Sequence, residues 1–375
     1  MSLMCLIIFA SASLLALLDS SVRAPETHSF VGINKTLKIG RKDLFPLLVI
    51  FSLSFLCATR DDASPDTFAY IDWYQRVCDL SVSQIDGEYG ILFEFVSRLV
   101  GLVFGGENYS FYFFFLTFFN NLVLYVAMKR LGGNYVARYI LYAFLIGIYY
   151  NFAVLRQGLA FTFLICAMSL WRYPNKRFTL LLLAPLAHNT AIVPVLYLIF
   201  VRCFSVGRRV LLFVCLAAVI NYIFRFSDPY IVPLMNYFTG LIPAAVMPRY
   251  ELYFLNGETG AGFSYFYLIY FILIAIMCFC FSQNEIRGEA AEDLSTKELL
   301  NVGVMGLVIL SFCATFTISV RFSDYFILPA IVLLLPQIRC KTIDPVRVPC
   351  MIGLCIVGLW LYCKMFLTKV PLFLL

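Results

Sequence analysis

Long apolar runs separated by short polar stretches are the dominant pattern along this chain of 375 residues. A helix that crosses a bilayer needs about 20 mostly apolar residues, and many of the runs approach that length. The pattern predicts an all-α polytopic integral membrane protein with roughly ten to twelve transmembrane helices. The predicted spans cover residues 3–18, 43–58, 90–104, 109–128, 138–152, 154–171, 178–201, 209–225, 263–281, 299–318, 324–337 and 350–367.

The polar stretches between the spans differ in charge, and the difference predicts the side of the membrane on which each one lies. Lysine and arginine are enriched in short cytoplasmic loops. We therefore expect the loops at about 20–42, 172–177, 282–298 and 339–348 in the cytoplasm, and the loops at about 60–88 and 226–262 on the outer side. The whole chain, 1–375, is expected to form a single polytopic membrane domain.

Two of the predicted spans do not fit this alternation of sides. If 60–88 is outside and 172–177 is inside, one of the segments between them cannot cross fully. The weakest is 90–104, which is short and carries Glu94 and Arg98, so it is either re-entrant or interfacial. Segment 178–201 has basic residues at both ends. Either one of its flanks breaks the charge rule, or it is a broken helix of the kind that lines a cavity.

The composition narrows the class of protein further. Hydrophobic residues make up 62% and charged residues only 13% of the chain, whereas soluble domains carry about 25% charged residues. An ordinary water-soluble enzyme is therefore excluded. The net charge of +6 resides in short loops and does not indicate a nucleic-acid partner. The 13 cysteines are scattered without a CxxC pair, which is typical of buried apolar positions rather than of a metal site.

The stretch LRQGLAFTFLICAMSLWRYPNKRFTLLLLAPLAHNTA, residues 155–191, holds the first candidate chemistry. A charged residue at the centre of a membrane helix costs about 2.5–3.5 kcal/mol, so Arg156 is expected to serve a purpose there. If 156–171 and 178–188 are antiparallel neighbours, Arg156 lies about 23 Å and His188 about 15 Å above the cytoplasmic loop. Both residues then lie in the outer half of the membrane, and a break at Pro185 brings them within reach of one cavity.

Further polar residues are expected near the same outer interface. Arginine binds phosphate oxygens bidentately and stays charged when partly buried, and a neutral histidine accepts a proton near neutral pH. Such a set suits a lipid pyrophosphate and a sugar hydroxyl. Simpler structural roles stay open for each residue, such as snorkelling of Arg156 to the lipid headgroups. The further candidates are Arg60, Asp66 and Tyr70 in the first outer loop, Gln157 beside Arg156, Arg249 in loop 226–262, and Arg321, Asp324 and Tyr325, which are expected to join two late spans.

Three motifs together resemble the EpsG-like family of Wzy-type polysaccharide polymerases. They are TRDDASPDTFAYIDWY, which begins at Thr59; LRQGLAFTFLICAM with KRF and LAHNTAIVP; and SVRFSDYF, which begins at Ser319. The resemblance implies a membrane glycosyltransferase of the GT-C-type architecture, in the bacterial inner membrane. Such an enzyme joins undecaprenyl-pyrophosphate-linked oligosaccharides of an O antigen or exopolysaccharide on the periplasmic face, inverting and without a metal or cofactor. A chain-length regulator is a further partner by resemblance.

The resemblance also implies roles for the candidate residues. Arg156 and Arg321 would hold the pyrophosphate leaving group, and His188 would act as the general base for the acceptor hydroxyl or would orient it. Two other functions stay open. One is a glycosyltransferase that uses a polyprenyl-phosphate sugar, for which Asp61 and Asp62 would supply the acidic pair in the first outer loop. The other is a transporter of lipid-linked sugar, which is not an enzyme.

Overall fold

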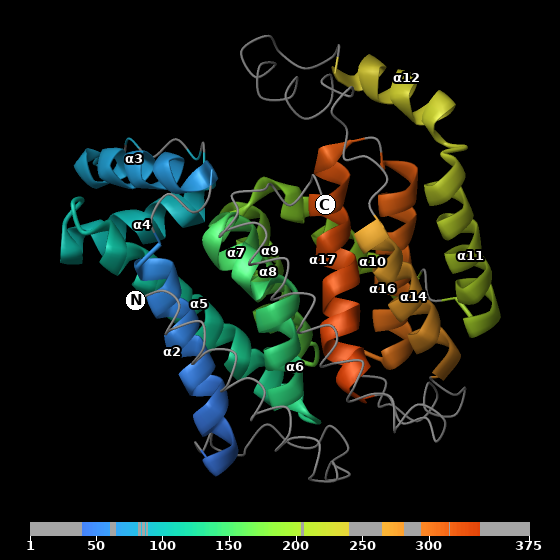
Figure 1. Cartoon of the computed structure of the whole chain (residues 1–375), viewed down its shortest axis with the longest axis horizontal. Helices are drawn as coiled ribbons and strands as arrows, with labels where there is room; N and C mark the ends of the chain where they lie inside the picture. Colours follow the sequence, from blue (N-terminus) through green and yellow to red (C-terminus); the bar gives the residue numbers. More distant parts are fainter. Residues whose placement is uncertain are drawn as a thin grey trace. The chain divides into compact units, whose positions relative to one another are not determined.

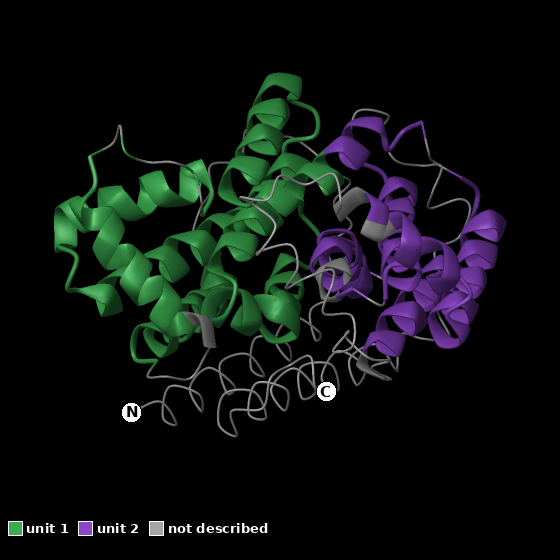
Figure 2. Ribbon diagram, turned by 90° about the horizontal axis from the view of Figure 1, so that it is seen from above, with its two compact units in different colours: residues 1–195, 341–369 green, residues 196–340, 370–375 purple. Residues whose placement is uncertain are grey.

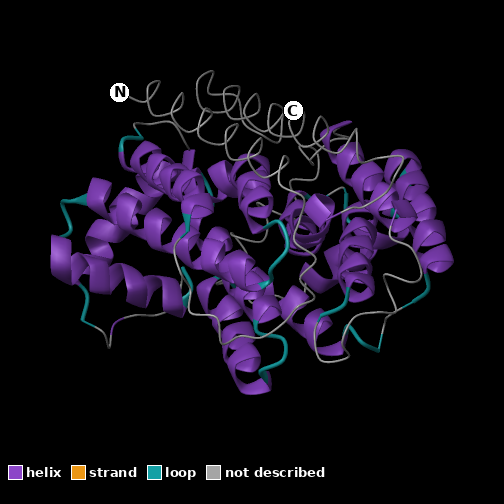
Figure 3. Ribbon diagram, turned by 90° about the horizontal axis from the view of Figure 1, so that it is seen from below, coloured by secondary structure: helices purple, strands orange, loops and turns teal. Residues whose placement is uncertain are grey.

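The computed structural model describes residues 40–60, 65–81, 84, 87, 89–203, 206–239, 265–280, 294–314 and 316–337. Within these residues every regular element is a helix and no strand occurs (Figure 3). The all-α prediction is thereby confirmed for this part of the chain. The predicted spans 3–18 and 350–367, most of loop 20–42 and the loop 339–348 lie outside the described residues.

The chain forms two compact units, residues 1–195 with 341–369 and residues 196–340 with 370–375 (Figure 2). The expected single membrane domain over 1–375 stays a prediction. The helices of the first unit are α2 (Leu44–Ala58), α3 (Pro65–Asp79), α4 (Ile91–Phe104), α5 (Tyr109–Arg130), α6 (Tyr135–Tyr142), α7 (Ile148–Phe152), α8 (Leu155–Ser169) and α9 (Pro174–Ala187), with the short turns η1 (Arg41–Asp43), η3 (Ala143–Gly147, a π-helix) and η4 (Asn189–Ala191).

Helix α10 (Ile192–Phe200) leads from the first unit into the second. The remaining helices are α11 (Arg208–Phe224), α12 (Asp228–Thr239), α14 (Tyr265–Cys280), α16 (Thr296–Phe312) and α17 (Thr317–Leu334), followed by η6 (Leu335–Gln337).

Several described helices have the length and composition of membrane spans. Tyr109–Arg130 and Val320–Gln337 qualify alone, and Arg208–Phe224 with Asp228–Leu234 makes a third span if this bent pair is counted as one. Leu155–Ser169, Asn189–Phe200 and Tyr267–Cys280 are apolar but shorter. The protein is therefore a helical membrane protein, while the expected ten to twelve spans and the GT-C-type architecture stay predictions.

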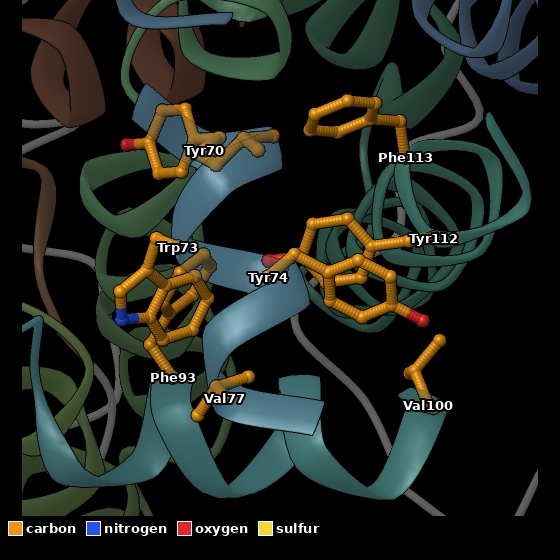
Figure 4. Close-up of a cluster of buried hydrophobic side chains, with 9 residues drawn as sticks. Tyr70, Trp73, Tyr74, Val77, Phe93, Val100, Tyr112 and Phe113 are labelled. Atoms are coloured by element: carbon orange, nitrogen blue, oxygen red, sulfur yellow. The ribbon is translucent and has the colours of Figure 1, made fainter. Parts of the chain in front are cut away.

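The stretch 60–88, expected to be a loop, contains helix α3. Tyr70, Trp73, Tyr74 and Val77 follow the spacing that places side chains on one face of a helix. All four are buried, and Figure 4 shows them beside residues of α4 and α5. The Trp73 ring stacks on Phe93 with centroids 5.1 Å apart. The outer position of this stretch stays a prediction, and the aromatic face between its acidic residues belongs to a packed helix.

Helices α3 and α4 pack on each other and lie across the direction of α2 (Figure 1). Cys78 of α3 fits closely against α4, since a Cβ on Gly101 would lie 2.2 Å from the Cys78 Sγ. Of the two alternatives left open for 90–104, this orientation favours an interfacial helix.

Two helix boundaries differ from the prediction in ways that matter for the candidate site. Segment 178–201 is broken as one alternative proposed, but Pro185 lies inside α9 and the break is at His188, whose backbone is extended. Arg321, Asp324 and Tyr325 do not join two spans, because α17 begins at Thr317 and includes them. The linker before α17 is therefore residues 313–316, which start before the SVRFSDYF motif.

The stretch 226–262, also expected to be a loop, begins with helix α12. The two helices α11 and α12 meet at an angle of 80°. The bend is held by Asn221, whose side-chain oxygen accepts the Ser227 backbone N–H at 3.0 Å and whose amide donates to the Ser311 carbonyl at 3.1 Å. Left-handed Arg225 completes the bend, with φ of 56°.

Buried amide side chains connect the helices of the first unit. The Asn121 amide donates to Asn151 Oδ1 at 3.0 Å, and the Tyr139 hydroxyl donates to Asn121 Oδ1 at 3.2 Å. All three side chains are buried. Polar residues of this kind hold transmembrane helices together by hydrogen bonds, so these contacts align α5, α6 and α7.

A second polar contact ties the start of α2 to the end of α5. The Asp43 carboxylate accepts hydrogen bonds from the Tyr125 hydroxyl at 2.5 Å and from Lys129 Nζ at 2.7 Å. Burial opposes ionisation of the carboxyl group, but the hydrogen bonds from Lys129 and Tyr125 outweigh this effect, so the pKa of Asp43 lies below its usual value. Because the pKa of Asp43 is lower in the folded than in the unfolded protein, its ionised carboxylate stabilises the fold at pH values above its unfolded-state pKa.

We expect Asp43→Asn to destabilise the protein by about 3 kcal/mol at pH 7, because it leaves Lys129 without its carboxylate. The difference in unfolding free energy between wild type and the variant should shrink as the pH falls from about 4 through the lowered pKa of Asp43. Thermal unfolding of detergent-solubilised protein measures both effects. The control is Asp72→Asn, which removes an exposed ion pair with Arg76 and should change stability little. Equal midpoints for the Asp43→Asn variant and wild type at pH 7 would contradict the role of this contact.

Candidate functional site

Helices α8 and α9 place two of the predicted functional residues at the same end of the first unit. They pack on each other, are joined by residues 170–173 and have nearly equal lengths, 15 and 14 residues. A short connection between packed helices makes them antiparallel. Arg156 in the first turn of α8 and His188 directly after α9 therefore lie at one end of this pair, as predicted. The turn η4 also contacts α8.

His188 forms the break between α9 and η4. Its backbone N–H still donates to the Ala184 carbonyl at 3.0 Å, and its carbonyl accepts the Ala191 N–H at 2.9 Å. The half-buried ring is fixed by Thr190, whose Oγ1 lies 2.5 Å from His188 Nδ1. Thr190 therefore engages Nδ1, one of the two ring nitrogens. A histidine oriented in this way through one nitrogen can exchange protons through the other.

Arg156 is a partly buried arginine with an incompletely used guanidinium group. Its Cζ lies 4.8 Å from the centre of the Tyr89 ring, a cation–π contact. Its Nε is buried, and no described residue accepts a hydrogen bond from it. A buried charged N–H group without an acceptor is costly. In the first turn of α8, where backbone N–H groups also favour an anion, this geometry suits binding of a phosphate-like group.

Gln157, the next residue, is directed into the protein. Its side chain is buried, and Nε2 donates to the Tyr150 hydroxyl at 3.4 Å. Gly158 packs closely against Tyr150 of α7, since a Cβ on Gly158 would lie 3.0 Å from the Tyr150 Cβ. These contacts anchor the first turn of α8 against α7, and substrate binding by Gln157 stays a prediction.

Arg60 and Tyr70 also have contacts inside the first unit. Arg60 Nη1 donates to the Phe152 carbonyl at 2.6 Å and lies near the Asn151 carbonyl at 3.4 Å. Its guanidinium Cζ stands 3.4 Å from the centre of the Phe113 ring. Arg60 thus caps the C-terminal end of α7. Tyr70 packs edge-on against Phe93 in the aromatic cluster of α3 and α4.

The remaining candidates lie elsewhere in the chain. Arg321, Asp324 and Tyr325 belong to the second unit, in the first half of α17. Asp324 is 3% exposed, and its Oδ1 has no hydrogen-bond partner among the described residues. Arg249 and the side chain of Asp66 lie outside the described residues. The expected meeting of Arg321 and Arg249 with Arg156 and His188 therefore stays a prediction.

Sequence reasoning missed the turn that leads into α4. Glu94 is buried and accepts the backbone N–H of Gly87 at 3.0 Å and of Tyr89 at 2.6 Å. Tyr89 is the residue against which Arg156 lies. The sequence contains a signal for this turn, since Gly87 and Gly90 stand just before an acidic residue in the first turn of a helix. Glu94 was instead interpreted only as a charge that weakens a membrane span.

Comparison with models of known protein families matches residues 43–373 to the EpsG family. The match covers most of the chain, from the start of α2 onwards. No curated protein and no solved structure matches the chain. The family resemblance read from the three sequence motifs is thereby confirmed.

The two arginines of the first unit should respond differently to substitution. Arg60→Ala removes the partner of the Phe152 carbonyl, so we expect a loss of about 1–3 kcal/mol of folding stability. Arg156→Ala removes mainly the contact with Tyr89 and should cost about 1 kcal/mol or less. Thermal unfolding of the two purified variants measures the difference. A larger loss for Arg156→Ala than for Arg60→Ala would show that Arg156 is the structural arginine.

Proposed function

Because the chain belongs to the EpsG family, whose members are Wzy-like polysaccharide polymerases, we propose that it polymerises undecaprenyl-pyrophosphate-linked oligosaccharide repeat units. The product is an O antigen or exopolysaccharide, and the reaction takes place on the periplasmic face of the bacterial inner membrane. The reaction is inverting and needs neither a metal nor a cofactor. The observation that carries the proposal is the placement of Arg156 and His188 at one end of the α8–α9 pair.

In the proposed displacement, His188 acts on the attacking hydroxyl and Arg156 acts on the leaving group. The acceptor sugar hydroxyl gives its proton to His188 Nε2 and attacks the anomeric carbon of the donor chain. The bond between that carbon and the pyrophosphate oxygen breaks, and its electron pair leaves with undecaprenyl pyrophosphate. Arg156 stabilises the developing charge on the leaving group, since a guanidinium binds phosphate oxygens bidentately. Arg321 assists in the same role by resemblance to the family.

Thr190 supports the role of His188 in this reaction. The 2.5 Å contact joins Thr190 Oγ1 to Nδ1 of the ring. With Nδ1 protonated and donating to Thr190, Nε2 carries the lone pair that a general base requires. Thr190 therefore acts as a positioning residue.

A topology in which α4 does not cross the membrane places the proposed reaction on the outer side. If α3 and α4 both lie at the outer interface, α5 enters the membrane from outside and ends at Lys129 and Arg130. The α6–α7 segment then returns outwards, and α8 descends to the basic loop 172–177. This path gives each basic loop a cytoplasmic position, as the positive-inside rule requires. Arg156 then lies on the outer side.

The break at His188 makes α9 and α10 a re-entrant pair in this topology. Helix α9 ends at Ala187, and α10 follows after the short turn η4. After α10, Arg202 forms an ion pair with Glu298 at 3.1 Å, and the Val206 N–H donates to Asn301. These contacts attach loop 201–207 to the start of α16, which follows the stretch 282–298 expected in the cytoplasm. Both ends of α9–α10 are then cytoplasmic.

We expect His188→Ala to lower the rate of polymerisation roughly 10²–10⁴-fold, as for loss of a general base. Arg156→Lys should also fail, because an ammonium group cannot replace the bidentate contact. A glycan gel of the deletion strain complemented with each variant, at equal protein levels in the membrane, measures both effects. Wild type should restore a ladder, and the variants should stop at one exported repeat unit.

Other outcomes of the same gel would favour other functions. A normal ladder from His188→Ala, with loss of the ladder in Asp62→Asn, would indicate a transferase that uses a polyprenyl-phosphate sugar. Single repeats retained inside the deletion strain would indicate a transporter. A normal ladder from Arg156→Lys would contradict bidentate phosphate binding.

The topology can be tested with Cys203, which is exposed in loop 201–207. In a variant that keeps Cys203 as its one cysteine, a membrane-impermeant maleimide should not label intact spheroplasts but should label opened membranes. The control is Glu107→Cys in the same background, between α4 and α5, which should be labelled in intact spheroplasts. Labelling of Cys203 in intact spheroplasts would show that α9 and α10 cross the membrane fully.

A further inference from the structure

We propose that Glu94 is a positioning residue, which acts through the turn Gly87–Gly90 to set the place of Arg156 relative to the end of α9 that carries His188. The inference rests on the proposed function, since it concerns the two residues that would carry the reaction. The contacts of the turn with the two helices meet in two consecutive residues, Tyr89 and Gly90.

Glu94 fixes the backbone of the turn with both of its carboxylate oxygens. Oε1 accepts the Tyr89 N–H at 2.6 Å and Oε2 accepts the Gly87 N–H at 3.0 Å. The Gly90 N–H closes the turn on the Gly87 carbonyl at 2.9 Å. Glu94 is 3% exposed, so water does not compete for these hydrogen bonds. A charged acceptor strengthens both of them.

Tyr89 transmits this placement to Arg156. The centre of its ring lies 5.1 Å from the centre of the Trp73 ring and 4.8 Å from the Arg156 guanidinium carbon. The backbone of Tyr89 is held by Glu94 and its ring by buried Trp73. The tyrosine ring is therefore a fixed surface, and the arginine takes its position from it.

Gly90 transmits the placement to the end of α9. Its φ is +99°, a region that favours glycine. A Cβ on this residue would lie 2.6 Å from the Ala187 carbonyl oxygen and 3.0 Å from that of Leu186. The backbone of the turn thus contacts the last two residues of α9, directly before His188. A side chain at Gly90 would have to push this helix end away.

One short turn consequently contacts the surroundings of both predicted functional residues. In a two-substrate displacement, misplacement of the reacting groups by about 1 Å can cost about 10²-fold in rate. We therefore expect changes in the turn to lower kcat much more than they alter KM for the lipid-linked repeat unit.

The test compares Gly90→Ala with Gly132→Ala in purified full-length protein. Both glycines have positive φ, +99° and +68°, but a Cβ on Gly132 would have no atom within 4 Å. Both variants place a side chain at positive φ, but only Gly90→Ala also meets the end of α9. We expect kcat to fall at least tenfold for Gly90→Ala and for Glu94→Gln, with KM within twofold of wild type. Gly132→Ala should stay within twofold of wild type in both.

A spectroscopic measurement separates this inference from the proposed function. The chain has 2 histidines, so protein labelled with ¹⁵N-histidine gives few imidazole signals, and His188→Gln identifies that of His188. We expect the His188 signal to move in Gly90→Ala and Glu94→Gln but not in Gly132→Ala. Tyr89→Phe, which keeps the ring, should retain kcat, whereas Tyr89→Leu should lose it.

The outcomes lead to different conclusions. An unmoved His188 signal, with kcat for Gly90→Ala equal to that for Gly132→Ala, overturns the inference and leaves the proposed function intact. If the His188 signal moves in Gly90→Ala and Glu94→Gln but wild-type protein makes no polymer from lipid-linked repeats, the placement by the turn is supported and the proposed function is overturned. Equal loss of kcat in Tyr89→Phe and Tyr89→Leu contradicts transmission through the ring.

Discussion

Wherever a helix breaks in this protein, the backbone groups released at the break need partners, and the rest of the structure depends on how they obtain them. In a bilayer no water is present to satisfy an exposed carbonyl or N–H group. At the end of α7 the Phe152 carbonyl is bound by Arg60. At the bend after α11 the Ser227 N–H is bound by the Asn221 side chain. At His188 the neighbouring backbone supplies the partners on both sides.

Two arginines with different contacts lie at the break between α7 and α8. Arg60 follows α2, donates through Nη1 to carbonyls of α7 and places its guanidinium over the Phe113 ring. Arg156 begins α8 immediately after the break and retains a buried Nε without an acceptor among the described residues. Arg60 therefore binds the backbone released at this break, and ligand binding by Arg156 stays a proposal.

Aromatic residues make one end of the first unit, formed by α3, α4 and the start of α5, rigid. The cluster of α3, α4 and α5 includes Trp73 and Tyr74, which stack on Phe93 and Tyr112 (Figure 4). Tyr74 also donates to the Gly105 carbonyl at 3.0 Å, across to the end of α4. Large rings with few rotatable bonds form a firm support of this kind at little entropic cost. The turn that meets Arg156 and α9 rests on this support through Tyr89.

The hydrophobic pattern determined the helical membrane class and the limits of segments such as 209–225, and three motifs that are contiguous in sequence determined the family. The sequence also placed Arg156 and His188 at one end of a helix pair, since their spacing and a short basic loop suffice for that. Only the tertiary structure decided that Arg60 caps a helix, that the break is at His188 instead of Pro185, and that Glu94 shapes a turn against both α8 and α9. These contacts join residues far apart in the chain. Whether such residues meet depends on how the helices pack, and helical periodicity carries no record of that.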